Sequence, residues 1–508
     1  MCVNQIYGAN DLAKKCYRNN GIDWLVTLTM NGKTFSFCQF VNQTKQETRS
    51  QMVALKGVRS HAVSIALAIT CALPVTPAHA QGLSFIRDTE IENLMNDYAR
   101  PIFRAAGLGT QRIKVRIVRQ SSFNAFVLDG RNVFMNTGTL VKSETPNQVI
   151  GVVAHETGHI AGGHLAGIRA KIKRDATRNL LMKILGIGAI IGGATAGGDA
   201  REIAGGVGKS ILYGSDTVSL LSLLSYRRAQ ESAADQAGIS YLNATRQSAY
   251  GMLETFEYFA QQEYFSGRFK DPYVRSHPMP HNRIAQLRQL AETSPYFTKK
   301  DPASLQLRHD LMRAKLAGFL DKPRAVFNAY PKSDQTLPAR YARAIAHFFQ
   351  GGMRSAGPKV EALIKERPDY PYFWELKGDF LFRSGRPNEA IGPLKKALSL
   401  AKGGSLIRVR LAQAMLASNK KRYVDQAIKY LRKALVDEKS SLGYRQLASA
   451  YFKKGNQSQA YLASAQAYFQ EGKLKDAQRL AKRAQAQFQT GTPLWIKADD
   501  IINFKPQT

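Results

Sequence analysis

The chain contains 508 residues, a length that corresponds to about three domains or segments, and 44% of its residues are hydrophobic. All four cysteines lie within the first 71 positions, which excludes a disulfide framework for the rest of the chain. The formal net charge of +34 is compatible with nucleic acid, anionic lipid, lipopolysaccharide or acidic polypeptide as a partner, and equally with a basic chain that has no anionic partner.

The first 80 residues have the features of a leader rather than of a folded domain. Residues 52–80 combine a basic start, a short apolar run and an A-x-A site, the pattern of a secretory signal peptide cleaved after Ala80. The apolar run is too short to anchor the chain in a membrane. We therefore expect Met52 to be the initiator and residues 1–51 to be an upstream extension without function. The exported chain would be periplasmic with a net charge of +29, and export argues against nucleic acid as a partner.

The next segments predict a small sheet followed by a helix. Residues 113–119 alternate apolar and basic side chains, which is typical of a half-buried strand. Residues 123–140 hold two β-rich runs around Asp129 and Gly130, a strong hairpin signal. The sequence TPNQ at 145–148 supplies an N-cap, a proline at the first helical position and a capping-box glutamine.

The predicted helix leads into the sequence HETGHIAGGH, which begins at His155. Its first five residues fit H-E-x-x-H, in which His155 and His159 lie one turn apart on the same helical face. Two such imidazoles can bind zinc, and Glu156 can take a proton from water beside the metal. The alternative is an amphipathic helix with incidental polar residues.

The third histidine of this segment is not predicted to be a zinc ligand. His164 follows His155 by nine residues, which on a continuous helix places it opposite the ligand face. A metzincin would carry its third histidine at position 165, which is leucine. We expect His164 to cap the helix or to form a hydrogen bond near its end.

A better third ligand lies in the segment 225–238. Glu231 and Asp235 are four residues apart and share one helical face. Glu231 is predicted to bind the metal and Asp235 to orient a ligand imidazole by accepting its hydrogen bond. Two histidines and one glutamate leave a position for water, which is typical of a catalytic zinc site with one ion per subunit. Taken alone, both acids could equally lie on a solvated helix face.

Three motifs in combination resemble one family. HETGHIAGGH, YRRAQESAAD (226–235) and SHPMPHNRI (276–284) are similar to the zinc metallopeptidases that include the heat-shock protease HtpX and the CAAX prenyl proteases. The resemblance is to the soluble, exported branch of β-barrel assembly-enhancing proteases and extends from about residue 88 to the C-terminus. It implies that His277 can approach the zinc as an extra ligand in a closed state. It also implies that Arg283 lies near the active site, where it can support the substrate carbonyl.

An uncharged, glycine-rich segment separates the two ligand motifs. Residues 184–198 number about 15, too few to span a bilayer, and their glycines weaken a helix. We interpret the segment as a flap between the two ligand helices that is either mobile or in contact with a membrane surface, with a buried helical hairpin as the alternative.

The C-terminal part predicts repeated helical hairpins. Small residues follow Trp374 at the spacings of a tetratricopeptide repeat: Gly378, Gly385, Ala390 and Ala397. Pairs of alanines seven residues apart recur at Ala427/Ala434, Ala460/Ala467 and Ala477/Ala484. Residues 341–352 and 366–373 suggest a diverged earlier repeat. Stacked repeats form a superhelix whose concave face binds proteins, whereas generic helical hairpins are the alternative.

Together these patterns predict a mostly helical α+β chain. Residues 81–300 are expected to form a gluzincin-like zinc metallopeptidase domain of helices with a small sheet. Residues 301–508 are expected to form an all-α tetratricopeptide-repeat solenoid.

The predicted activity is that of a zinc-dependent endopeptidase for unfolded or misassembled envelope proteins, which it could degrade or help to assemble. An edge strand at Asn124–Leu128, including Ala125 and Phe126, or at 133–136 is expected to pair with an extended substrate. Further expected partners are the outer-membrane assembly machinery, through the repeats, and a membrane surface. The alternative function is a chaperone-like scaffold with vestigial proteolysis.

Overall fold

The computed structural model describes residues 84–111, 113–171, 173–174, 225–266, 272–278 and 281–506, and the backbone of two short strands before them. The chain divides into two compact units, Met1–Gln81 and Gly82–Thr508. In the first unit, β1 (Leu25–Met30) pairs antiparallel with β2 (Lys33–Cys38). The sequence did not predict this hairpin. Because an isolated two-stranded hairpin is marginally stable in water, it does not by itself make a folded domain.

A four-stranded sheet lies at the start of the second unit, within the described residues. Its strands run in the order β3 (Phe85–Ile86), β4 (Lys114–Val118), β6 (Asn132–Asn136) and β5 (Ala125–Asp129). The β5–β6 hairpin turns at Gly130, as the sequence predicted, and β6 pairs in parallel with β4. The strand β5 therefore forms one edge of the sheet, and β6 lies in its interior.

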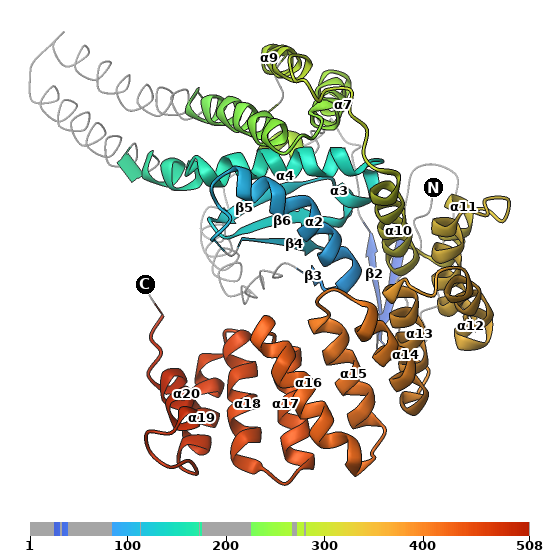
Figure 1. The fold of residues 1–508 in the computed structure, drawn as a ribbon, viewed down its shortest axis with the longest axis vertical. Coiled ribbons are helices and arrows are strands. Elements are labelled where there is room, and N and C mark those ends of the chain that lie inside the picture. The colour runs from blue at the N-terminus through green and yellow to red at the C-terminus, as the bar shows by residue number, and fades with distance from the viewer. Residues whose placement is uncertain are drawn as a thin grey trace, which may run out of the picture. The chain divides into compact units, whose positions relative to one another are not determined.

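Helical segments around this sheet carry the motifs. They are α2 (Thr89–Ala105), α3 (Thr137–Lys142), α4 (Pro146–Ala161), the helical residues 225–244, α7 (Tyr250–Ser266), α8 (Pro272–Ser276) and α9 (His281–Glu292). The helices α2, α3 and α4 contact the strands of the sheet, while α7 packs on α4 and α9. Figure 1 shows α2 and α4 beside the strands β4, β5 and β6. The predicted capping box at the start of α4 is present, since Thr145 accepts a hydrogen bond from the Gln148 amide and the Gln148 side chain accepts one from the Thr145 amide. Local cap chemistry thus fixes where the helix that carries His155 and His159 begins.

The remainder of the chain is helical. Its helices are α10 (Ala303–Leu320), α11 (Pro323–Ala329), α12 (Leu337–Glu366), α13 (Pro371–Arg383), α14 (Pro387–Leu400), α15 (Ser405–Ala417), the short η1 (Lys421–Tyr423), α16 (Val424–Asp437), α17 (Ser441–Lys453), α18 (Gln457–Gln470), α19 (Leu474–Gln485) and α20 (Pro493–Ile502). From α13 onward each helix packs on the next in the chain, as Figure 1 shows. A Cβ atom at Gly378 would lie 2.5 Å from Leu394, so the helices α13 and α14 can approach closely only with glycine there.

The predicted small residues of the repeats are buried where the helices meet. The exposed fraction is 7% or less at Ala390, Ala397, Ala427, Ala434, Ala460, Ala467, Ala477 and Ala484. This packing confirms the predicted fold class, a mostly helical α+β chain with a repeat-like solenoid after the sheet.

The helix α10 joins the two predicted domains. Its Met312 and Leu316 pack in the core around the sheet, whereas Leu311 and Ala314 pack in the first core of the repeats. Residues 82–508 accordingly form one compact unit. The predicted boundary at residue 300 precedes this shared helix and remains a prediction.

Two predictions concern segments outside the described residues, namely the signal peptide (52–80) and the glycine-rich segment (184–198). Among the helices that the structure describes, none is both long and apolar enough to cross a membrane.

Candidate metal centre

Four side chains from three separate segments converge at one point. His155, His159, Glu231 and His277 each offer one ligand atom, and these four atoms lie within 4.8 Å of one another. His155 and His159 come from α4, Glu231 from the helical residues 225–244, and His277 from the residue after α8. The structure therefore brings together the three predicted ligands and the histidine implied by the family resemblance.

The spacing of these atoms fits a tetrahedral metal ion. Nε2 of His155 lies 3.1 Å from Nε2 of His159, 3.2 Å from Nδ1 of His277 and 3.4 Å from a Glu231 oxygen. With zinc–ligand distances of about 2.0–2.1 Å, neighbouring ligands of a tetrahedral zinc ion are about 3.3 Å apart. The three distances from His155 therefore match the spacing of ligands around one small cation, and all four atoms lie within 4.8 Å of one another.

Each imidazole has a partner for its second nitrogen. His155 Nδ1 donates to Asp235 Oδ1 over 2.9 Å, and His277 Nε2 donates to the Ala125 carbonyl over 3.3 Å. The Nδ1 atoms of His159 and His164 lie 2.9 Å apart. Such contacts fix the tautomer and orientation of a ligand ring, and they leave the other nitrogen free to bind a metal.

The site has three carboxylates and one guanidinium, which gives a net charge of −2 when all four are ionised. Glu156, Glu231 and Asp235 are all buried, and Arg283 is the buried guanidinium beside them. Burial alone would favour protonated carboxyls, but the charge of His277 and hydrogen bonds from the histidines hold the pKa of Glu231 well below its usual value. The pKa of Asp235 is likewise lowered against burial, chiefly by Arg283. Metal binding instead requires neutral imidazoles, and in that state the group carries the net charge that a divalent cation neutralises.

The side chain of Glu156 lies beside the four convergent residues without being one of them. Its Oε1 atom is 3.4 Å from His277 Nε2 and makes no hydrogen bond to any residue that the structure describes. A buried carboxylate oxygen without a hydrogen bond is costly. A water molecule bound to a metal ion here would supply the missing hydrogen bond. The residues present therefore fit the zinc ion that the family resemblance implies.

Close contact between two helices positions the ligands. A Cβ atom at Gly158 of α4 would lie 2.8 Å from the Ala234 carbonyl oxygen, so only glycine lets the helical residues 225–244 approach this near. Glycine at this position thus allows Glu231 to reach His155 and His159, one on each of its oxygens.

Arg283 contacts carboxylates of the site, whereas the family resemblance implied that it supports the substrate carbonyl. Its Nε and Nη2 atoms bind the two oxygens of Asp235 at 2.6 and 2.9 Å, and Nη1 lies 3.1 Å from Glu231. Nη1 also donates to the Pro278 carbonyl over 2.7 Å. These contacts place Arg283 behind the metal ligands, where it holds Glu231, Asp235 and the His277 loop together.

The predicted position of His164 is wrong. The extrapolation assumed a continuous helix, but α4 ends at Ala161 and the chain turns at Gly163, whose φ is +62°. His164 therefore folds back onto His159 instead of lying on the opposite face. A Cβ atom at Gly162 would lie 2.3 Å from its ring, so the glycine pair is the sequence signal for this turn. His164 is not among the four residues whose ligand atoms converge, and its exclusion as a ligand remains a prediction.

The edge strand lies directly beside the metal group. Of the two predicted substrate strands, β5 is the edge and includes Ala125 and Phe126, whereas the residues 133–136 pair on both sides within the sheet and are excluded. Asn124, just before β5, accepts a hydrogen bond from Ser276 beside His277. The sequence gave no sign that the Ala125 carbonyl would contact His277.

Comparison with known proteins agrees with this geometry. Residues 86–291 match the model of peptidase family M48. The chain is 25% identical over 410 residues to the β-barrel assembly-enhancing protease of Escherichia coli strain K12, which covers 77% of this chain and 80% of the relative. It is 22% identical over 380 residues to the protein of the same name from Yersinia pestis, covering 74% and 75%.

Proposed function

We propose, on the premise that residues 86–291 are a metallopeptidase domain of peptidase family M48, that this chain is an exported, zinc-dependent endopeptidase for misfolded or misassembled envelope proteins. The observation that carries the proposal is the tetrahedral group of His155, His159, Glu231 and His277 beside the buried carboxylate of Glu156. In such a site a bound zinc ion supplies Lewis-acid polarisation of water and of the scissile carbonyl.

The remaining chemistry is assigned to the protein's own side chains. Glu156 removes a proton from the attacking water and returns it to the amine that leaves. Asp235 orients His155 through the hydrogen bond to its Nδ1 atom, and His164 does the same for His159. Arg283 is a positioning residue, because its guanidinium binds Asp235 and Glu231 rather than open space. We propose this positioning role for Arg283 in place of the substrate-supporting role that the family resemblance implied.

We assign substrate pairing to β5. An extended polypeptide can add to this edge through main-chain hydrogen bonds, which is how many proteases hold chains of varied sequence. The Ala125 carbonyl that such a strand would use is contacted by His277. Movement of His277 away from the centre would free both this carbonyl and one metal position.

The proposed clients and location rest on the relatives. Two of them are named for assisting β-barrel assembly, a process of outer-membrane proteins. The signal peptide predicted at 52–80 supports export to the periplasm, and the repeats after α10 offer a surface for clients or for the outer-membrane assembly machinery. One zinc ion per chain and contact with a membrane surface remain part of the proposal.

The test is digestion of a purified, unfolded outer-membrane β-barrel protein by the purified chain. Cleavage should require about one zinc ion per chain and should stop with a chelator. It should resume when zinc is restored. A folded soluble protein of the same size should resist. Zinc-independent cleavage would refute the proposed chemistry, and equal cleavage of both substrates would refute the client class.

A second candidate function is a chaperone-like scaffold whose proteolysis is latent. The observation in its favour is that His277 fills the position a catalytic zinc leaves for water. Binding of unfolded clients without cleavage, at full zinc occupancy, would favour this candidate.

Replacing His277 with alanine is expected to increase the rate of cleavage. The change frees one metal position and the Ala125 carbonyl, while His155, His159 and Glu231 still bind zinc. The measurement compares initial rates and zinc content of His277→Ala and wild type on one unfolded substrate. If His277 instead donates a hydrogen bond to the transition state, the rate should fall by about 10²–10³-fold at unchanged zinc content, which would eliminate the inhibitory role.

A further inference from the structure

A pocket lies where the sheet meets the repeats, and it is separate from the metal centre. This junction pocket has a volume of about 550 Å³ and is bounded by β3 and Arg119 on one side and by α10, α13 and α15 on the other. Volumes of 300–1,000 Å³ are typical of ligand sites. Since β3 and β5 are the opposite edges of the sheet, the junction pocket and the metal centre flank it on different sides.

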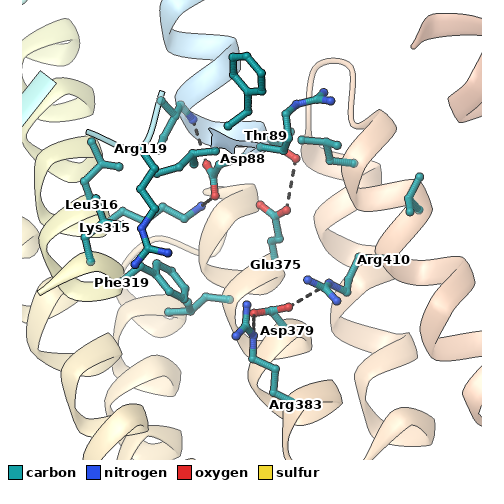
Figure 2. A pocket seen from close by; sticks show the side chains of 18 of the residues that line it. Asp88, Thr89, Arg119, Lys315, Leu316, Phe319, Glu375, Asp379, Arg383 and Arg410 are labelled. Carbon is teal, nitrogen blue, oxygen red and sulfur yellow. Dashed lines mark hydrogen bonds and ion pairs between the residues drawn. The ribbon is translucent and has the colours of Figure 1, made fainter. Parts of the chain in front are cut away.

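Cations exceed anions around the junction pocket. Figure 2 shows Arg383 and Arg410 converging on the single carboxylate of Asp379, and both form ion pairs with it. Arg119 extends toward the pocket from the side of the sheet. Lys315 is neutralised by Asp88 and Glu90, at 2.7 and 3.2 Å. The pocket therefore favours an anionic group near Arg119, Arg383 and Arg410.

Glu375, which also lines the pocket, has one carboxyl oxygen without a hydrogen bond to a described residue. Oε1 of Glu375 accepts from the Thr89 hydroxyl over 3.3 Å, whereas its buried Oε2 has no hydrogen-bond partner among the described residues. Burial raises the pKa of this carboxyl to about 8. Burial thus favours the protonated form of Glu375, which can donate a hydrogen bond to a ligand carbonyl or carboxylate.

The remaining lining is apolar and partly open to solvent. Phe349 is 47% exposed and Leu442 is 49% exposed, and Leu316, Phe319 and Leu376 line the same pocket. Exposed apolar side chains also occur elsewhere on the solenoid, as at Phe452, but Phe349 and Leu442 both line one pocket, and such apolar lining indicates a binding surface.

We propose that the junction pocket binds an extended segment of the client polypeptide in which a large apolar side chain neighbours a carboxylate. The apolar side chain would cover Phe349 and Leu442, and the carboxylate would pair with Arg410 and Arg119. This inference rests on the proposed function. Pairing with β5 does not depend on the client's sequence, and the junction pocket would supply the selectivity for one class of client. Binding at the β3 edge holds one part of the client while another part reaches β5, which raises its effective concentration at the metal centre.

The test measures binding separately from cleavage. The full chain carrying Glu156→Gln is titrated into a fluorescein-labelled peptide that alternates phenylalanine and glutamate, and fluorescence anisotropy gives the Kd. Matched peptides replace every glutamate with glutamine, or every phenylalanine with serine. We expect the glutamate–phenylalanine peptide to bind at least about tenfold more tightly than either, since charge-assisted contacts and apolar burial each contribute that much.

Two variants assign the binding to the junction pocket. Arg410→Gln and Phe349→Ala should each weaken binding of this peptide by about tenfold or more. The matched controls are Arg479→Gln and Phe452→Ala, which remove the same side chains from positions 60% and 74% exposed elsewhere on the solenoid. Both controls should bind like the parent chain. If circular dichroism finds Arg410→Gln unfolded, Arg383→Gln takes its place.

Three outcomes would overturn the inference. They are equal affinity for the glutamate and glutamine peptides, equal affinity for the phenylalanine and serine peptides, and pocket variants that bind as tightly as their controls. Because the readout needs no proteolysis, a chain that binds the peptide through this pocket but cleaves nothing would refute the proposed function and leave the inference standing.

Discussion

Replacing Glu156 with glutamine should abolish cleavage while leaving the zinc content of the chain unchanged. Glutamine has nearly the same size and occupies the same buried position beside His277, but its amide cannot take the proton of the attacking water. A general base contributes about 10²–10⁴-fold to the rate, so the residual activity should lie at or below the limit of detection. Initial rates on an unfolded outer-membrane protein, with zinc per chain measured on the same sample, check both parts.

The control is Glu144→Gln, which removes an exposed carboxylate just before α4. It should cleave at the wild-type rate. Full proteolysis by Glu156→Gln would show that another group takes the proton. Loss of zinc from this variant would instead assign Glu156 to the metal, although Glu156 is not among the four residues whose ligand atoms converge.

Local signals in the sequence were sufficient for the elements that carry the site. Asp129 and Gly130 favour a tight turn, and the segment 145–148 holds a complete capping box, so the hairpin and the start of α4 follow from neighbouring residues. Helical periodicity then places His155 and His159 on one face. These features need no knowledge of the rest of the fold.

Contacts between distant segments could not be predicted in this way. Arg283 reaches Asp235 from 48 residues away, and His277 meets the Ala125 carbonyl across 152 residues. Both depend on how α8 and α9 pack on the sheet and on residues 225–244, which no local pattern specifies. The family resemblance placed His277 and Arg283 near the centre, but only the structure shows that Arg283 contacts the carboxylates of Asp235 and Glu231.

The error at His164 has a definite physical origin. The 100° step per residue holds only while the helix continues, and the glycine pair at 162–163 ends it. A positive φ at Gly163 reverses the chain, so residues that were counted onto the far face return to the near one. Periodicity is thus a reliable guide up to the first residue that can leave the helical conformation at low cost.

Removing Glu231 should have the largest effect on the metal itself. Glu231→Ala deletes the one anionic ligand and leaves the buried guanidinium of Arg283, now without this partner, facing the cation. His277 could remain as a third neutral ligand, but three imidazoles beside the positive charge of Arg283, which is then paired with Asp235 alone, bind zinc much less well than the native group. We expect Glu231→Ala to lose its zinc on dialysis and to be inactive, and the double variant with His277→Ala to behave in the same way.

His164→Ala provides the contrast, because His164 contacts a ligand without being one. Losing its contact with His159 Nδ1 removes an orienting partner, and such partners contribute about 10–100-fold to metal affinity. This variant should therefore keep zinc at micromolar free metal and lose it only under stronger chelation than the wild type needs. Equilibrium dialysis against graded chelator gives the order wild type, His164→Ala, Glu231→Ala. The reverse order for the two variants would mean that the metal is bound by the three histidines of HETGHIAGGH and that Glu231 merely pairs with Arg283.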